Sequence, residues 1–169
     1  EHVRRRASDC GLVENIIVAS GDREIIETVK DYGGEVKQTY RKHLNGTSRV
    51  AEAVEDIDCS HVIVIQGDEP LIQKEQLKNL TTAINLNPDI DSWNSISDLN
   101  SEKELNNINV VKAALNEEGQ IIYFFRKSPS YAEFCNQIKY IKKVQGLIAY
   151  KKSVLIEIAK SSTPVIEKY

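Results

Sequence analysis

The amino-acid sequence predicts an α/β fold in which helices cover both faces of a mixed, mostly parallel sheet. One observation is that short apolar runs, which suit buried strands, alternate along the first half of the chain with segments of helical periodicity. Another is that two of these runs, residues 15–20 and 61–65, are almost continuously apolar. Strands of that kind are typical of parallel sheets, because helices shield both faces of such sheets from water.

The first half of the chain is predicted to run helix, strand, helix, strand, helix, strand, helix. Helices are expected over residues 1–10, 22–32, 47–57 and 73–86. Strands are expected between them, over residues 15–20, 35–40 and 61–65.

The helix predicted from residue 22 carries clear local signals. Asp22 is a candidate N-cap, since its side chain can accept hydrogen bonds from the free N–H groups of a first turn. Ile25, Ile26 and Val29 follow at helical spacing, and the glycine pair at 33–34 is a typical helix stop.

The second half of the chain changes rhythm and is rich in predicted strands. The strand-like segments are SWNSIS, NVVKAAL, QIIYFFRK and YIKKVQGLIAY. Residues 116–120 suit a hairpin turn, and residues 152–160 suit a short helix. The chain shows no repeat or linker, so residues 1–169 are predicted to form one domain. We expect this domain to be incomplete at both ends, because Glu1 falls inside a predicted helix and Tyr169 inside an apolar-rich segment.

The composition restricts the class of protein. Hydrophobic residues make up 41% of the chain and charged residues 28%, as in globular domains. The net charge of -3 argues against a nucleic-acid binder, and the run Arg4–Arg6 is interpreted as a solvated or ligand-facing helix edge. No apolar run approaches the roughly 20 residues that cross a membrane. Three widely spaced cysteines favour reduced thiols in a cytoplasmic protein.

An acidic turn follows the most apolar of the predicted strands. Residues 67–70, Gly-Asp-Glu-Pro, stand where ligands bind in open parallel sheets, beyond the carboxyl end of a strand. Mg²⁺ prefers one or two carboxylates together with waters and phosphate oxygens, which makes Asp68 a candidate metal ligand. The alternative is a strand-end turn whose carboxylates point into water.

A second polar segment, residues 43–49, runs into the start of a predicted helix. Free backbone N–H groups at a helix N-terminus attract anions. Thr47 can cap that helix or bind a ligand, and Arg49 offers a bidentate fork for phosphate or a base edge. An N-capped surface helix is the alternative. Both polar segments are predicted to lie at the same edge of the sheet, which favours a shared site.

The two segments resemble paired motifs of a known family. RKHLNGTSRVAEAVE followed by VIVIQGDEPLI is similar to H-x-S-G-T-E-R-x-x-E and V-Q-G-D-E-P of the CMP-Kdo synthetases, the 3-deoxy-manno-octulosonate cytidylyltransferases. NIIVASGDREI and NVVKAALNEEGQIIYFFRKSP resemble further stretches of that family, and VQGLIAY stands where the family has H-I-G-I-Y-A-Y. The resemblance covers nearly the whole chain.

The resemblance implies a nucleotide-diphospho-sugar transferase fold, which is Rossmann-like, and a nucleotidyltransferase activity. In the family's reaction, CTP and the acidic sugar 3-deoxy-manno-octulosonate (Kdo) give CMP-Kdo and pyrophosphate. The resemblance gives Asp68 a catalytic role as a ligand of Mg²⁺, and Gln66 a contact with the sugar.

The resemblance also assigns the nucleotide site. Asn45, Gly46, Thr47 and Arg49 are implied to line the cytidine nucleotide, with Arg49 counted among the catalytic residues. Arg126 is implied to pair with the sugar carboxylate, a role that suits a bidentate guanidinium. A surface charge at a strand end is the alternative for Arg126.

The sequence also departs from the family pattern. The family's N-terminal phosphate loop and the C-terminal carboxylate of its metal site have no counterpart in these residues, so we expect the main phosphate grip to be lacking. Ser48 replaces a glutamate, and Phe125 replaces the serine before the sugar-binding arginine. Val144 and Ile148 stand where the family has a histidine and a tyrosine near the sugar. The sugar side of the pocket is therefore expected to be more apolar.

Three hypotheses for the function stay open. The first is a cytidylyltransferase for Kdo, and the second is one for another ulosonic or sialic-type acid. The third is a non-catalytic nucleotide-binding relative. Family members are commonly dimers, and a cluster of aromatic residues in the second half suits a homodimer contact or a monomer core equally well.

Overall fold

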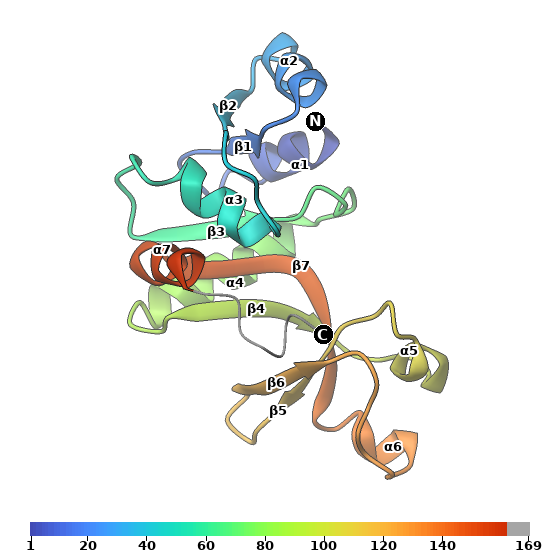
Figure 1. Ribbon diagram of the computed structural model, residues 1–169. Helices are drawn as coiled ribbons and strands as arrows, with labels where there is room; N and C mark the ends of the chain where they lie inside the picture. Colours follow the sequence, from blue (N-terminus) through green and yellow to red (C-terminus); the bar gives the residue numbers. More distant parts are fainter. Residues whose placement is uncertain (162–169) are drawn as a thin grey trace. The chain divides into compact units, whose positions relative to one another are not determined.

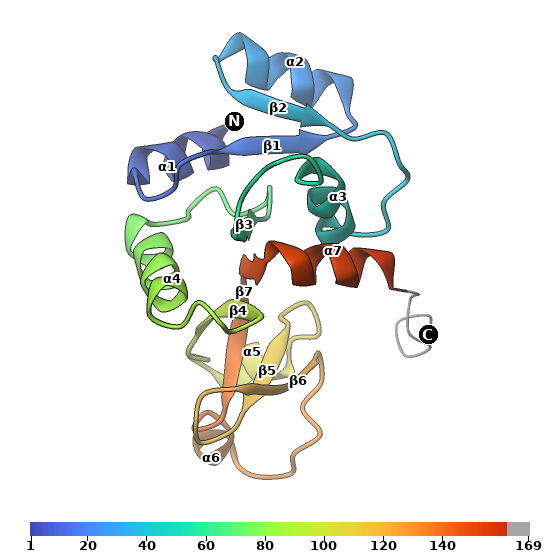
Figure 2. The same ribbon diagram turned by 90° about the vertical axis from the view of Figure 1, so that its left-hand side faces the viewer.

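The computed structural model describes residues 1–161 (Figures 1 and 2). These residues form two compact units. Unit 1 comprises Glu1–Trp93 and the chain from Gly146 onward, and unit 2 comprises Asn94–Gln145. Strands β4 (Ser92–Ser97) and β7 (Ile141–Lys151) each contribute residues to both units. Since both strands are shared between the units, the division does not test whether the whole chain is one domain, which stays a prediction. The apolar segment predicted around Tyr169 lies outside the described residues.

Unit 1 contains the helices and strands predicted for the first half of the chain, in the predicted order. Its helices are α1 (His2–Cys10), α2 (Arg23–Asp31), α3 (Gly46–Ala53), α4 (Lys74–Leu86) and α7 (Lys152–Lys160). Its strands are β1 (Ile17–Ser20), β2 (Glu35–Gln38), β3 (His61–Ile65) and the last residues of β7. None of the helices in residues 1–161 is long and apolar enough to cross a membrane.

The strand pairs of unit 1 run in both directions. β1 and β2 are parallel, with Ile17 opposite Glu35 and Ser20 opposite Gln38. β3 is antiparallel to β7, with Ile65 opposite Leu147. The α/β class is confirmed. Of the strand pairs whose register is described, β1–β2 is parallel and the others are antiparallel. Apolar content indicates that a strand is buried, but it does not specify the neighbour with which the strand pairs.

Two apolar clusters hold unit 1 together. In one of them Ala7 of α1 and Leu77 of α4 pack with Leu147 of β7, all three at most 3% exposed. In the other, Ala51 of α3 packs against Leu155 of α7, which is fully buried. Helix α3 therefore lies side by side with α7 in both views (Figures 1 and 2). This packing holds α3 in place, and α3 carries residues of the candidate site described below.

The N-cap predicted for α2 is correct, whereas the N-cap predicted for α3 is not. The predicted N-cap of α2 is confirmed, since the Asp22 carboxylate accepts hydrogen bonds from Glu24 N at 2.9 Å and Ile25 N at 3.2 Å. Helix α3 begins earlier than predicted, because the cap is the Asn45 side chain, which accepts from Ser48 N at 2.9 Å. Thr47 therefore lies within the first turn and does not cap the helix.

Unit 2 is built on an antiparallel hairpin. β5 (Lys112–Leu115) pairs with β6 (Ile121–Phe125) and also with the first residues of β7. The predicted turn over residues 116–120 is confirmed by the hydrogen bond from Asn116 N to Gln120 O at 2.9 Å. Two short helices that the sequence did not predict, α5 (Glu102–Asn106) and α6 (Phe134–Gln137), complete the unit.

Candidate active site

A pocket of about 630 Å³ opens at the carboxyl ends of the parallel strands β1 and β2. It is lined by residues 19–22, by Ile25 of α2, by residues 39–43 and by Arg49 of α3. Its position is the one at which open parallel sheets bind ligands. Its volume lies within the roughly 300–1,000 Å³ of small-molecule sites. We call residues 39–43, which connect β2 towards α3, the pocket wall.

Three residues of the pocket are in close contact. Arg49 Nη1 donates to Thr39 Oγ1 at 2.9 Å, and the Thr39 residue is 4% exposed. A Cβ added to Gly21 would lie 3.0 Å from Thr39 O and 3.3 Å from Arg49 Nη1, so glycine makes room for this contact. A guanidinium has five N–H donors, and one of them holds Arg49 to the pocket wall.

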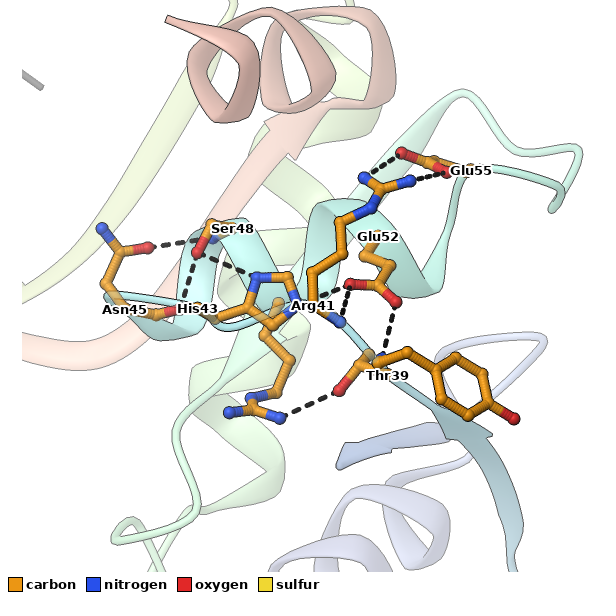
Figure 3. A network of polar contacts seen from close by, with 9 residues as sticks. Thr39, Arg41, His43, Asn45, Ser48, Glu52 and Glu55 are labelled. Atoms are coloured by element: carbon orange, nitrogen blue, oxygen red, sulfur yellow. Dashed lines mark hydrogen bonds and ion pairs between the residues drawn. The ribbon is translucent and has the colours of Figure 1, made fainter. Parts of the chain in front are cut away.

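The carboxylate of Glu52 binds the pocket wall to α3 (Figure 3). It accepts hydrogen bonds from Tyr40 N at 2.8 Å and Arg41 N at 3.3 Å, and it contacts His43 Nε2 at 2.6 Å. The backbone N–H of Tyr40 and, to a smaller extent, the His43 imidazole lower the pKa of Glu52 below its ordinary value, although burial opposes them. Glu52 is therefore held as a carboxylate.

The same wall is joined to α3 at two further points. His43 Nδ1 lies 3.2 Å from Ser48 Oγ, whose hydroxyl donates to Asn45 O at 3.0 Å. Arg41 forms a bidentate ion pair with Glu55, with distances of 2.9 and 3.1 Å, and this carboxylate raises the pKa of the arginine. Ser48 thus replaces the family's glutamate with a residue that contacts the histidine.

The predicted nucleotide residues of the 43–49 segment are divided by the structure. Arg49 lines the pocket, whereas Asn45, Gly46 and Thr47 form the cap and the first turn of α3. Gly46 is exposed and a Cβ added there would meet nothing within 4 Å, so this turn is open to an approaching ligand.

The two carboxylates of the acidic turn differ in their surroundings. Glu69 Oε1 accepts a hydrogen bond from Gly146 N of β7 at 2.8 Å, while Gln66 N donates to Gly146 O at 3.0 Å. Asp68, between them in sequence, is exposed, as is Gln66. Glu69 therefore ties the turn to β7 and leaves Asp68 at its surface, while the predicted convergence of this turn with the 43–49 segment stays a prediction.

The acidic turn has few of the side chains that a metal site built from protein ligands alone would need. Among residues 1–161 there is no group of three or more His, Cys, Asp or Glu side chains placed to hold a metal ion. Mg²⁺ is commonly bound through one or two carboxylates and the phosphates of a substrate. The exposed Asp68 offers one carboxylate of the kind that binds such an ion.

Arg126 lies in unit 2, directly after β6. Its Nη1 donates to Ile108 O at 3.0 Å, and the residue is exposed. The carbonyl of Arg126 accepts a hydrogen bond from Lys112, whose Nζ also donates to Asn107 O and Val110 O, both at 2.8 Å. Lys112 is fully buried, and this burial lowers the pKa of its ammonium.

Sequence reasoning missed three of these side chains: Glu52, His43 and Lys112. A signal existed for Lys112, because it is the single charge within the apolar run NVVKAAL. His43 and Glu52 match polar positions of the family motif. Their contact could not be inferred from periodicity or composition, because they lie nine positions apart, one before α3 and one within it.

The arginine-lined pocket lies beyond the ends of parallel strands, where doubly wound α/β enzymes bind their nucleotides. A family model described as cytidylyltransferase matches residues 1–161. The chain belongs to the cytidylyltransferase family, and it is a nucleotidyltransferase. This confirms the resemblance found in the sequence.

Individual relatives match over almost the whole chain. The 3-deoxy-manno-octulosonate cytidylyltransferase of Fusobacterium nucleatum is 35% identical over 169 residues, which cover 99% of this chain and 68% of the relative. The enzyme of the same name from Geobacter metallireducens is 30% identical, over 99% of this chain and 70% of the relative. A solved structure of a CMP:2-keto-3-deoxy-manno-octonic acid synthetase complexed with CTP superposes with a TM-score of 0.89 at 25% identity, over 99% of this chain and 68% of that one. The predicted transferase fold is thereby confirmed.

Proposed function

We propose that this protein activates Kdo by transferring a cytidylyl group from CTP to the sugar acid. The anomeric hydroxyl oxygen attacks the α-phosphorus, the bond from that phosphorus to the bridging oxygen of the β-phosphate breaks, and pyrophosphate leaves. The hydroxyl proton is released. The observation that carries the proposal is the match of 99% of the chain to two enzymes named for this reaction, at 35% and 30% identity.

The pocket at the ends of β1 and β2, with the first turn of α3, is proposed as the nucleotide site. Arg49 and Lys42 line the pocket and provide positive charge for phosphate oxygens or a base edge. The first N–H groups of α3, at Gly46 and Thr47, have no partner within the helix and suit an anion. Such groups accelerate phosphoryl transfer mainly through alignment and charge neutralisation.

Asp68 is proposed to hold Mg²⁺ together with the phosphates of the nucleotide. When bound, this ion would neutralise charge that develops on the phosphate oxygens. Asp68 is free to take this position because Glu69, and not Asp68, ties the turn to β7.

Arg126 of unit 2 is proposed as a ligand of the sugar acid. The exposed guanidinium of Arg126 suits the carboxylate of the sugar acid, since it forms bidentate pairs with carboxylates. A related ulosonic or sialic-type acid is the second candidate substrate. It is favoured by the apolar Val144 and Ile148, which stand where the family has polar groups.

The proposed assembly is a cytoplasmic homodimer formed through unit 2. Ile122 and Phe124, which point to the same face of β6, are 63% and 51% exposed, although large apolar side chains are usually buried. Phe125 and Phe134 instead pack on the core of unit 2, so the predicted aromatic cluster serves both purposes. An exposed apolar strand face is typical of an interaction surface.

The test is a pyrophosphate-release assay with CTP and a panel of 2-keto sugar acids. The expected result is turnover with Kdo that exceeds turnover with the other acids and that stops when CTP is replaced by ATP. Faster turnover with another ulosonic acid would support the second candidate. CTP binding without pyrophosphate release from any sugar would favour a non-catalytic nucleotide-binding relative.

A further inference from the structure

The pocket wall lies between β2 and α3 and belongs to neither element. A backbone segment without a helix or a strand ladder must find other partners for its N–H groups. Thr39 N donates to Ser20 O at 3.0 Å, which extends the pairing of β1 and β2 by one residue. The next two backbone N–H groups, those of Tyr40 and Arg41, donate to one side chain, the carboxylate of Glu52.

The Glu52 carboxylate and the His43 imidazole are both largely shielded from water. Their side chains are 12% and 5% exposed. An ionised carboxylate only accepts hydrogen bonds, so at 2.6 Å the Nε2 of His43 is the donor. Charge-assisted bonds of this kind are stronger than neutral ones, particularly where little water competes.

Two side chains of helix α3, about one turn apart, form hydrogen bonds with the pocket wall. Glu52 holds Tyr40, Arg41 and His43, while the guanidinium of Arg49 holds Thr39 at 2.9 Å. A displacement of the wall would therefore also move the acceptor that orients Arg49.

We infer that Glu52 and His43 are positioning residues for the nucleotide. They act through the pocket wall and Arg49, and they touch neither substrate nor reacting atoms. The inference rests on the proposed function, because it assumes that the pocket takes CTP. A role limited to folding would predict a loss of stability with CTP affinity unchanged, whereas a positioning role predicts a selective loss of CTP affinity.

The first test is Glu52→Gln, which keeps the shape of the side chain but removes its charge. The Kd for CTP, measured by calorimetry, is expected to rise about tenfold or more, because hydrogen bonds to a charged group are lost. The KM for the sugar acid and kcat at saturating CTP are expected to change by less than about threefold. Glu55→Gln is the matched control, because Glu55 lies close by in sequence and also pairs with the pocket wall, through Arg41, but its side chain is 37% exposed. Its effect on CTP affinity is expected to stay within about twofold.

A second pair of variants keeps the test decisive if Glu52→Gln folds poorly. His43→Phe retains a buried ring without a donor and is expected to weaken CTP binding, while His43→Gln can still donate to Glu52 and is expected to restore most of it. Wild-type CTP affinity in both Glu52→Gln and His43→Phe overturns the inference alone. A wild-type protein that binds no CTP overturns the proposed function and the inference together.

Discussion

The contact between Glu69 and Gly146 allows the consequence of one added methyl group to be worked out. A Cβ added to Gly146 would lie 2.6 Å from Glu69 Oε1 and 2.7 Å from its Cγ, distances that real Cβ atoms do not adopt. In Gly146→Ala the Glu69 side chain must therefore leave, and its hydrogen bond to the backbone N–H is lost. A hydrogen bond to a charged group contributes about 1.5–3 kcal/mol. Alanine recovers about 0.4–1 kcal/mol by restricting the unfolded chain, so the free energy of unfolding should fall by about 0.5–2.6 kcal/mol.

Urea denaturation at neutral pH measures this change as a lower midpoint with an unchanged slope. The matched control is Gly67→Ala, in the acidic turn that carries Glu69. A Cβ at Gly67 meets nothing within 4 Å, so no stability should be lost. In the Glu69→Ala background the side chain that clashes is already absent, so Gly146→Ala should cost little more. A Gly146→Ala protein as stable as the wild type would refute the reasoning.

Other predictions concern the metal, the buried lysine and acid stability. Asp68→Asn is expected to lower Mg²⁺-dependent pyrophosphate release by at least about a hundredfold while the melting temperature is kept; near-normal rates would exclude the metal role. Lys112→Met leaves three carbonyls without their donor, so urea denaturation should show a loss of at least about 2 kcal/mol, and an unchanged midpoint would contradict the bonding described. The lowered pKa of Glu52 means that its contribution to stability is present above its ordinary value of 4.5 and is lost as the pH falls through the lowered pKa of the folded protein. Melting temperatures should therefore decline less in Glu52→Gln than in the wild type as the pH falls below 4.5, and parallel declines would argue against this.

Local structure was accessible from the sequence because its causes lie within a few residues. The order of helices and strands in unit 1 follows from apolar periodicity, and the cap of α2 follows from one carboxylate beside free N–H groups. The turn over residues 116–120 is likewise local. Asn45 shows the limit of such reasoning, because two neighbouring polar residues could each cap α3 and only backbone geometry decides between them.

The α/β class, the succession of the first seven elements and, through its motifs, the family could all be inferred from the amino-acid sequence. Tertiary structure alone decided that β7 runs antiparallel to β3, that Glu52 holds the pocket wall and that Glu69 binds Gly146, 77 residues away. The physical reason is range: periodicity and capping operate within a few residues, whereas these partners meet only after the chain has folded. For that reason the acidic turn could be identified as important from the sequence, while the different surroundings of its two carboxylates could not.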